Sequence, residues 1–453
     1  MAEFDLAVLG GRVVTPDGTI RADIAIAAGK IAAIGAVPAG AARRTIAAED
    51  RLVLPGVVDS HVHVRDPGYT YKEDFASASA AAAAGGVTTM MCMPNTDPVL
   101  DRAQVFYDTA AAGETKSVVD FALQGLATAH NLGELAALHD LGVVTFEVFL
   151  AGPDSLVTQG RADQFRVFEA LARLDATTGL YPDDGAAAQV LDGLGSGRIA
   201  DIVAAHPPEL EAGTLLPAAT LAAAAGCRIH FRQMSSALSA ACAAALKAKL
   251  PAGRFTCEVT PHHLTLNVTD FERAGPAGHI MPPLRSAADN DALWAALRAG
   301  TVDAIGTDHS PHAWAEKLKG DGDLRHAIPG FPGLETFLPV VLTEMRARGF
   351  DEGDFVRFAC GNPAKLFGLY PRKGAIQVGS DADLAIVDES AGYLIEPLRF
   401  HSKAHYSPFG GRTVQARVER TLVRGEVVFE RGKVVAVAGH GQLLKPQRGR
   451  DRR

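Results

Sequence analysis

Eight short apolar runs alternate with longer alanine-rich stretches between Arg51 and Tyr370, and this alternation limits the possible folds more than any other feature of the sequence. The runs cover residues 52–64, 85–95, 117–127, 142–151, 176–185, 226–236, 254–263 and 301–312. The stretches between them are rich in alanine and leucine, which are strong helix formers. Strands that alternate with helices are typical of parallel sheets. Eight such units predict an α/β fold in the form of a (β/α)8 TIM barrel.

The two ends of the chain have a different texture. Residues 1–52 and 374–440 contain short strand-like segments separated by glycine-rich turns. We therefore expect them to form one small discontinuous β-domain, a β-sandwich, beside a barrel of residues 53–373. Residues 441–453 end in PQRGRDRR and are predicted to be a flexible tail.

Charge and composition exclude several classes of partner. The net charge is -8, whereas a nucleic-acid surface needs clustered lysine and arginine. The sequence has no apolar run of the roughly 18 to 20 residues that cross a bilayer. The segment MAEFDLAVLGG lacks a basic region followed by an apolar one, so we do not expect secretion. Its five cysteines are scattered without CxxC spacing, which fits reduced thiols. We expect a cytoplasmic protein that binds neither nucleic acid nor membrane.

The segment DSHVHVRDPG, residues 59–68, ends the first predicted barrel strand. Alternation along a strand places His61 and His63 on one face, where two imidazoles can share a metal ion. An isolated HxH pair more often packs or forms hydrogen bonds. The end of a barrel strand, however, is where barrel enzymes place their chemistry. The motif therefore predicts a metal pair.

The segment GTDHSPH, residues 306–312, ends the eighth run. Asp308 could bind a metal and also accept a proton from bound water, the two roles that a hydrolytic carboxylate needs. The alternative is an aspartate that caps a helix or a turn. We interpret Asp308 as the catalytic residue.

Several segments, taken in order, resemble those of the cyclic amidohydrolases of the amidohydrolase superfamily. They are HVHVRDPGYTYKED, MCMPNTDPV, EVTPHH, MPPLR, TDHSPH, IPGFPGLE and GNPAKLFGL. Within that group of dihydroorotases, hydantoinases and allantoinases, the combination of RDPG and MPNT is most similar to dihydroorotase. The likeness runs from about Asp5 to about Gly439. It implies a hydrolase that opens a ring amide or imide with water activated by one or two divalent metals, usually zinc.

The resemblance also implies six metal ligands, and three of those positions differ here. His61, His63 and Asp308 match the family. The family's lysine is replaced by Glu147 in FEVF. In the family the HxH pair, the bridging carboxylate and the aspartate surround one metal. The resemblance thus implies a single divalent ion, zinc by expectation, held by His61, His63, Glu147 and Asp308.

Two later histidines of the family, which hold only the second metal, are also replaced. Tyr181 stands at one position, in LYPDD, and Gln233 at the other, in HFRQMSS. These two residues are expected to mark a vacated second-metal position. Asp183 and His230 are possible substitute ligands, although His230 lies an odd number of residues from Gln233 and should point to the other face.

The role of Glu147 has two interpretations. Its carboxylate resembles that of a carboxylated lysine but stands on a shorter stem, so it can fall short of the metal. Alternatively, Glu147 pairs with Arg232 or another inward-facing base, and no ion is present.

The residues implied to bind the substrate match the family better. Arg65, Asn95 and His312 occupy positions that hold the substrate carboxylate in dihydroorotase, and such a set is a sensible carboxylate clamp. Met281 stands where the family commonly has an asparagine that contacts the ring amide. The ring can therefore differ from dihydroorotate.

Together these features predict a hydrolase for a cyclic amide that carries a carboxylate, dihydroorotate or a close analogue, with Asp308 moving the proton. The alternative is a catalytically inactive, dihydroorotase-like chain that serves as a structural partner, for example of aspartate transcarbamoylase. A shifted activity such as deamination is a third possibility, against which Tyr181 argues. By resemblance, the chain is expected to form a homodimer or homotetramer.

Overall fold

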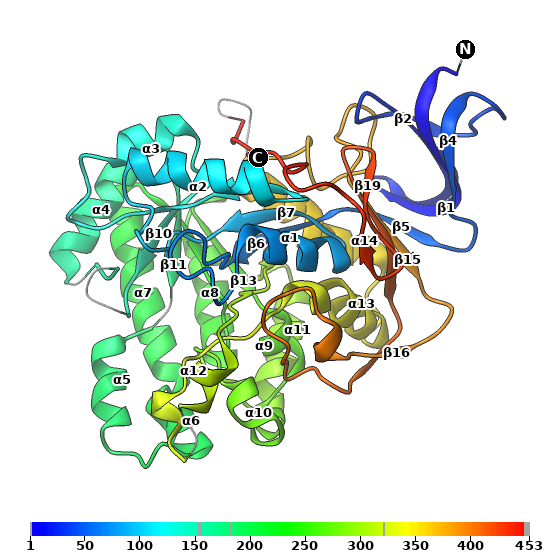
Figure 1. The fold of residues 1–453 in the computed structure, drawn as a ribbon. Coiled ribbons are helices and arrows are strands. Elements are labelled where there is room, and N and C mark those ends of the chain that lie inside the picture. The colour runs from blue at the N-terminus through cyan, green and yellow to red at the C-terminus, as the bar shows by residue number, and fades with distance from the viewer. Residues whose placement is uncertain (1, 153–155, 159, 182, 320–321, 448–453) are drawn as a thin grey trace.

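A ring of parallel strands occupies the centre of the computed structural model, and a β-rich domain stands beside it (Figure 1). The structure describes residues 2–152, 156–158, 160–181, 183–319 and 322–447. No helix within these ranges is both long and apolar enough to cross a membrane.

The barrel strands fall within the eight runs predicted from the sequence. They are β6 (Val57–Val62), β7 (Val87–Cys92), β8 (Asp120–Leu123) with its continuation β9 (Gly125–Leu126), β10 (Phe146–Phe149), β11 (Thr177–Tyr181), β12 (Arg228–Phe231), β13 (Phe255–Val259) and β14 (Ala304–Ile305). Neighbours pair in parallel in chain order, and a parallel bridge between Val62 and His309 joins the last segment to the first strand. The predicted (β/α)8 fold is confirmed.

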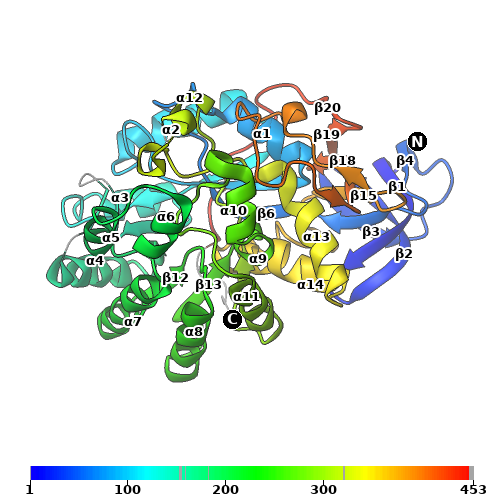
Figure 2. The same ribbon diagram turned by 90° about the horizontal axis from the view of Figure 1, so that it is seen from below.

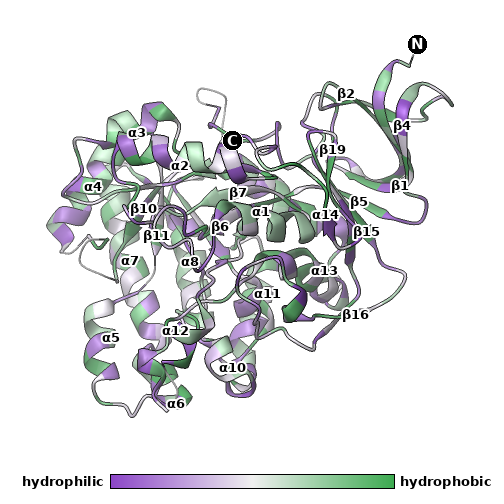
Figure 3. Cartoon of the chain, viewed as in Figure 1, coloured by the Kyte–Doolittle hydropathy of each residue, from purple (hydrophilic) through white to green (hydrophobic). Residues whose placement is uncertain are grey.

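Outer helices follow the strands in turn and cover the barrel (Figure 2). They are α1 (Phe75–Ala84), α2 (Ala103–Lys116), α3 (Leu135–Leu141), α4 (Arg161–Arg173), α7 (Pro208–Ala225), α8 (Ala237–Lys249), α11 (Ala287–Arg298) and α13 (Phe337–Ala347). Helix α1 is mainly apolar, whereas α4 carries hydrophilic residues on its outer side (Figure 3). Side-chain caps stabilise the N-terminal ends of α1 and α8. The Asp74 carboxylate accepts a hydrogen bond from the Ser77 amide in α1, and the Ser236 hydroxyl accepts one from the Ser239 amide in α8.

Short helices lie in the connections that leave the carboxyl ends of the strands. They are α5 (Gly185–Asp192), α6 (Ile199–Ala205), α9 (Pro261–Thr265), α10 (Val268–Ala274) and α12 (Trp314–Leu318), with α14 (Glu352–Val356) and α15 (Asn362–Leu366) after the last outer helix. Because α5, α6, α9, α10 and α12 come between a strand and its outer helix, they surround the mouth where a barrel enzyme holds its site.

Both ends of the chain share the β-domain, as predicted. Its strands are β1 (Phe4–Thr15), β2 (Gly18–Ala27), β3 (Lys30–Gly35), β4 (Ala42–Ala47), β5 (Leu52–Pro55), β15 (Leu384–Asp388), β18 (Arg417–Val423), β19 (Glu426–Glu430) and β20 (Lys433–Val434). They form one continuous nine-stranded sheet in which β5 pairs with β15. That pairing connects the two ends.

The segment between β15 and β18 leaves this sheet and returns to the barrel. It contains β16 (Tyr393–Leu394) and β17 (Thr413–Val414). Its apolar residues Ile395 and Phe409 belong to the same buried cluster as Phe271 of α10. Part of the predicted 374–440 domain therefore packs against the connections at the mouth.

The predicted tail requires a correction. Leu444 is fully buried, its amide donates to the Phe121 carbonyl at 2.7 Å, and the Gln447 amide donates to the Gly368 carbonyl at 2.7 Å. Residues 441–447 are thus packed against the barrel, whereas 448–453 lie outside the described residues. The prediction rested on the basic residues at the end of the chain, whereas the apolar Leu443 and Leu444 just before them pack against the barrel.

Candidate metal centre

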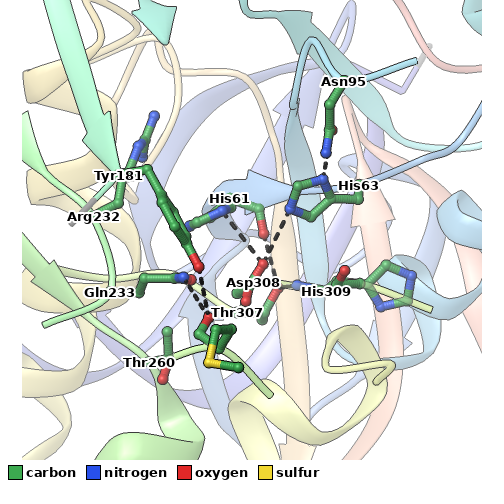
Figure 4. A network of polar contacts seen from close by, with 12 residues as sticks. His61, His63, Asn95, Tyr181, Arg232, Gln233, Thr260, Thr307, Asp308 and His309 are labelled. Atoms are coloured by element: carbon green, nitrogen blue, oxygen red, sulfur yellow. Dashed lines mark hydrogen bonds and ion pairs between the residues drawn. The ribbon is translucent and has the colours of Figure 1, made fainter. Parts of the chain in front are cut away.

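His61, His63 and Asp308 converge at the carboxyl end of the barrel (Figure 4). The Asp308 Oδ1 atom lies 3.1 Å from His63 Nε2 and 3.4 Å from His61 Nε2. One ligand atom from each residue lies within 4.8 Å of the others, and all three residues are buried. Within the described ranges, this is the only such group of histidine, cysteine, aspartate and glutamate side chains.

Backbone contacts between the first strand and the last segment set this geometry. His61 belongs to β6, and His63 follows directly after the strand. The His63 amide donates to the His309 carbonyl at 2.8 Å, and the His309 amide donates to the His61 carbonyl at 3.2 Å. Asp308 has a φ of +48°, a left-handed conformation that is uncommon for residues other than glycine. This turn lies at the point where the carboxylate meets the two imidazoles.

Each of the two histidines has an outer partner on its other ring nitrogen. His61 Nδ1 lies 2.9 Å from Glu258 Oε1, and His63 Nδ1 lies 2.7 Å from Asn95 Oδ1. We assign the proton to Nδ1 in both rings, which leaves both Nε2 atoms as ligands. Glu258 was missed by the sequence reasoning, although it is the glutamate of the segment EVTPHH. Asn95, expected to contact substrate, contacts His63.

The pKa values of the two histidines shift in opposite directions. Burial lowers the pKa of His63 to about 4, despite the Asp308 carboxylate beside it. Burial also lowers the pKa of His61, but Asp308 and Glu258 more than offset this, so the pKa lies above its ordinary value. Two imidazole nitrogens and one carboxylate oxygen are a donor set that zinc takes in catalytic sites, with a further position left open. The three residues fit one divalent ion.

Glu147, the fourth predicted ligand, is not part of this group. Its Oε1 atom lies 2.6 Å from Arg232 Nη2, and its Oε2 atom accepts from Arg232 Nε at 3.2 Å. Both oxygens are thus held by one guanidinium, and both residues are buried. Of the two interpretations of Glu147, the structure shows the ion pair with Arg232.

Tyr181 and Gln233, expected at the vacated second-metal position, meet at the carbonyl of Met281 (Figure 4). Tyr181 Oη donates to that oxygen at 3.2 Å and Gln233 Nε2 at 2.8 Å. Gln233 lies two residues beyond β12 and has a φ of +39°. Its buried Oε1 atom has no hydrogen-bond partner within the part of the chain that the structure describes.

Neither possible substitute ligand joins the group of three. His230 Nε2 lies 3.0 Å from Glu258 Oε2, and His230 Nδ1 lies 2.8 Å from Thr256 Oγ1. Asp183 Oδ2 lies 3.5 Å from His206 Nδ1. Both side chains are therefore engaged elsewhere.

A second cluster beside the centre contains two cations, of which Lys72 is paired with Glu316 at 3.0 Å. Arg65 Nη2 donates to Ser310 Oγ at 2.6 Å and lies 3.1 Å from His312 Nε2, while Lys72 Nζ lies 3.2 Å from His312 Nδ1. Burial, followed by the charges of Arg65 and Lys72, lowers the pKa of His312. The buried Nε of Arg65 has no partner among the described residues. Arg65 and His312 are brought together as predicted; Lys72 was missed, although it belongs to the quoted segment YTYKED.

Comparison with known proteins identifies the family. A family model described as the Amidohydrolase family matches residues 187–428, and one described as Dihydro-orotase-like matches residues 50–239. The chain belongs to the amidohydrolase family. The resemblance inferred from the sequence motifs is thereby confirmed.

Individual relatives of this amidohydrolase carry different names. An L-hydantoinase from Paenarthrobacter aurescens is 35% identical over 97% of this chain and 98% of its own length. An allantoinase from Streptomyces avermitilis (34%; 97% and 98%) and a dihydroorotase from Methanosarcina acetivorans (34%; 97% and 95%) are similar to the same degree. The solved structure of an L-hydantoinase from Arthrobacter aurescens aligns with a TM-score of 0.94 at 34% identity, over 98% of this chain and all of the other. These relatives do not distinguish between ring substrates.

Proposed function

We propose that this amidohydrolase opens a cyclic amide that carries a carboxylate, with water activated at a single divalent cation, for which zinc is the expected ion. The observation that carries the proposal is the convergence of His61, His63 and Asp308 at the carboxyl end of the barrel. The relatives named hydantoinase, allantoinase and dihydroorotase support a cyclic amide as the substrate class.

The chemistry divides between the centre and the cationic cluster. A divalent ion held by His61, His63 and Asp308 would lower the pKa of a bound water and polarise the amide carbonyl. Asp308 takes the proton of the attacking water at Oδ2, because its Oδ1 faces the histidines, and passes it to the leaving ring nitrogen. Arg65, with one open N–H donor, binds the carboxylate of the ring.

The cationic cluster favours one kind of ring over the others. Lys72 is already paired with Glu316 at 3.0 Å, whereas the buried Arg65 bonds the neutral Ser310 and His312, so a bound anion would supply the counter-charge that Arg65 lacks. Dihydroorotate and close analogues carry such an anion, whereas hydantoin and allantoin do not. We therefore place an acidic six-membered ring first among the substrates.

A direct assay tests this function. Zinc-loaded protein is expected to open L-dihydroorotate faster than hydantoin or allantoin. Replacement of Arg65 by alanine should raise KM for dihydroorotate and leave that for hydantoin nearly unchanged. If zinc-loaded wild-type protein opens none of these rings, the proposal is wrong.

A structural role is the second candidate, favoured by the internal partners of Glu147, Tyr181 and Gln233. In that case the chain would bind no zinc and would instead form a stable complex, for example with aspartate transcarbamoylase. Co-elution of the two purified proteins tests this directly. A homodimer or homotetramer remains our prediction for the chain alone, to be measured by light scattering.

A further inference from the structure

The guanidinium of Arg232 is the most completely hydrogen-bonded cation beside the metal centre. Nε and Nη2 hold the two oxygens of Glu147, and Nη2 also donates to Gln124 Oε1 at 2.7 Å. Nη1 donates to the Ser60 carbonyl at 3.2 Å and to Glu258 Oε2 at 3.0 Å. These five bonds use all five N–H groups that an arginine has. Arg232 has no donor left for a substrate, so its role is carried out through its partners.

Glu258 connects Arg232 to the metal centre, because it bonds both Arg232 and His61. Its Oε2 atom accepts from Arg232, Ser60 and His230, and its Oε1 atom is left for His61 Nδ1. Burial raises the pKa of Glu258, but the Arg232 charge and the bonds from His230 and His61 reverse this and hold it well below its ordinary range. Glu258 is therefore a fixed anion whose free oxygen points at one nitrogen of His61.

The charges of this network leave one negative charge beside the metal centre. Glu147 and Glu258 contribute two negative charges, and Arg232 contributes one positive charge. The remaining negative charge faces His61, whose opposite nitrogen faces Asp308 (Figure 4). A carboxylate bonded to the outer nitrogen of a metal-binding histidine fixes its tautomer and raises its basicity.

The space for Glu147 is also fixed. A Cβ atom at Gly179 would lie 2.1 Å from Glu147 Oε1, so the carboxylate fits only because residue 179 is a glycine. For Glu147 to bind an ion, it would have to leave two N–H groups of the buried Arg232 without their acceptors, which is unfavourable.

We propose that Arg232 is a positioning residue: it retains the carboxylate of Glu147 and, through Glu258, orients His61, so that the centre offers ligands for one cation and none for a second. This inference rests on the proposed function, because it concerns how the same centre is held. It adds that Arg232 and Glu258 position His61.

The test uses Glu258→Gln, which keeps the shape of the side chain and removes its charge. The matched control is Glu211→Gln, which changes an equally buried carboxylate whose hydrogen bonds go to Ser235. We expect Glu258→Gln to weaken zinc binding by about 10- to 100-fold, the usual effect of losing such a partner. The control should bind zinc as the wild type does.

Nuclear magnetic resonance of the metal-free protein gives a readout that does not depend on activity. The His61 Nδ1 proton should be slow to exchange in the wild type and in the control, and should exchange fast in Glu258→Gln. The double variant Glu147→Met/Arg232→Met, which takes away the cation that holds Glu258, should also weaken zinc binding.

Two results would overturn the inference. One is unchanged zinc affinity and unchanged proton exchange in a folded Glu258→Gln protein. The other is wild-type protein that binds two ions with Glu147 as a ligand. Failure of the proposed function looks different, because the wild type would then bind no zinc or open no ring while the proton measurement still reported the network.

Discussion

The residues that the sequence resemblance places at metal positions form two halves, which differ in what their side chains contact. In the first half, His61, His63 and Asp308 point their ligand atoms at one another and have outer partners that orient them. In the second half, the residues at ligand positions are held by the chain itself: Glu147 by Arg232, and Tyr181 with Gln233 by the Met281 carbonyl. We refer to these as the open half and the closed half. The difference teaches that an internal partner decides, as much as residue type does, whether a side chain is free to bind an ion.

The largest effect is expected in the open half. Asp308→Asn keeps the size of the side chain but cannot take the proton, so ring opening should fall by roughly 10²- to 10⁴-fold. Steady-state assays at saturating zinc measure this. Tyr181→Phe serves as the comparison in the closed half, and equal losses in the two variants would mean that the halves do not differ as described.

The second-largest effect is expected on the free energy of unfolding, when a residue of the closed half loses its partner. Arg232→Leu leaves Glu147 and Glu258 buried without their cation, which should cost about 3–5 kcal/mol in the free energy of unfolding. The double variant Glu147→Met/Arg232→Met leaves only Glu258 without its cation and should lose less. Urea unfolding of the metal-free proteins separates the two, and a single variant as stable as the double would contradict the ion pair's role.

Sequence alone predicted the frame of the molecule and the open half. Strands and helices repeat their apolar residues at different intervals, so the eight apolar runs could be assigned as strands without knowing which strands pair. The alternation of side chains along a strand was enough to place His61 and His63 on one face. The closed half depends on contacts between strands. The Arg232 pair joins β10 to the residue that follows β12, with β11 between the two strands, and the local sequence left it as one of two interpretations. Lys72 and Glu258 lay in recognised segments, but nothing local showed which neighbour each would meet.

Low pH should destabilise the segment that contains Met281, whose carbonyl accepts hydrogen bonds from the closed half. His279, two residues before Met281, stacks on Phe271, and neither of its ring nitrogens has a partner within the described ranges. Burial, helped by the charge of Lys317, lowers its pKa to about 3. The unfolded chain binds this proton near pH 6.5, so the stability that depends on neutral His279 is complete above that pH and is lost as pH falls toward 3. His279→Phe should shift acid unfolding to lower pH; a larger sensitivity to acid would argue against this assignment.

The smallest effect is expected at the Met281 carbonyl. Tyr181→Phe removes one hydrogen bond to it and leaves the bond from Gln233, so the free energy of unfolding should fall by about 0.5–1.5 kcal/mol. Thermal unfolding measures the loss. Zinc content should not change, and a gain of bound zinc in this variant would show that the tyrosine itself had blocked a site.

The number of zinc ions bound per chain tests the difference between the halves most directly. Protein purified without added ions, then equilibrated with excess zinc and dialysed, is analysed for metal beside His61→Ala and Glu147→Gln variants. We predict one zinc per chain in the wild type, its loss in His61→Ala and its retention in Glu147→Gln. Two zinc ions per chain, or loss of the ion in Glu147→Gln but not in His61→Ala, would contradict it.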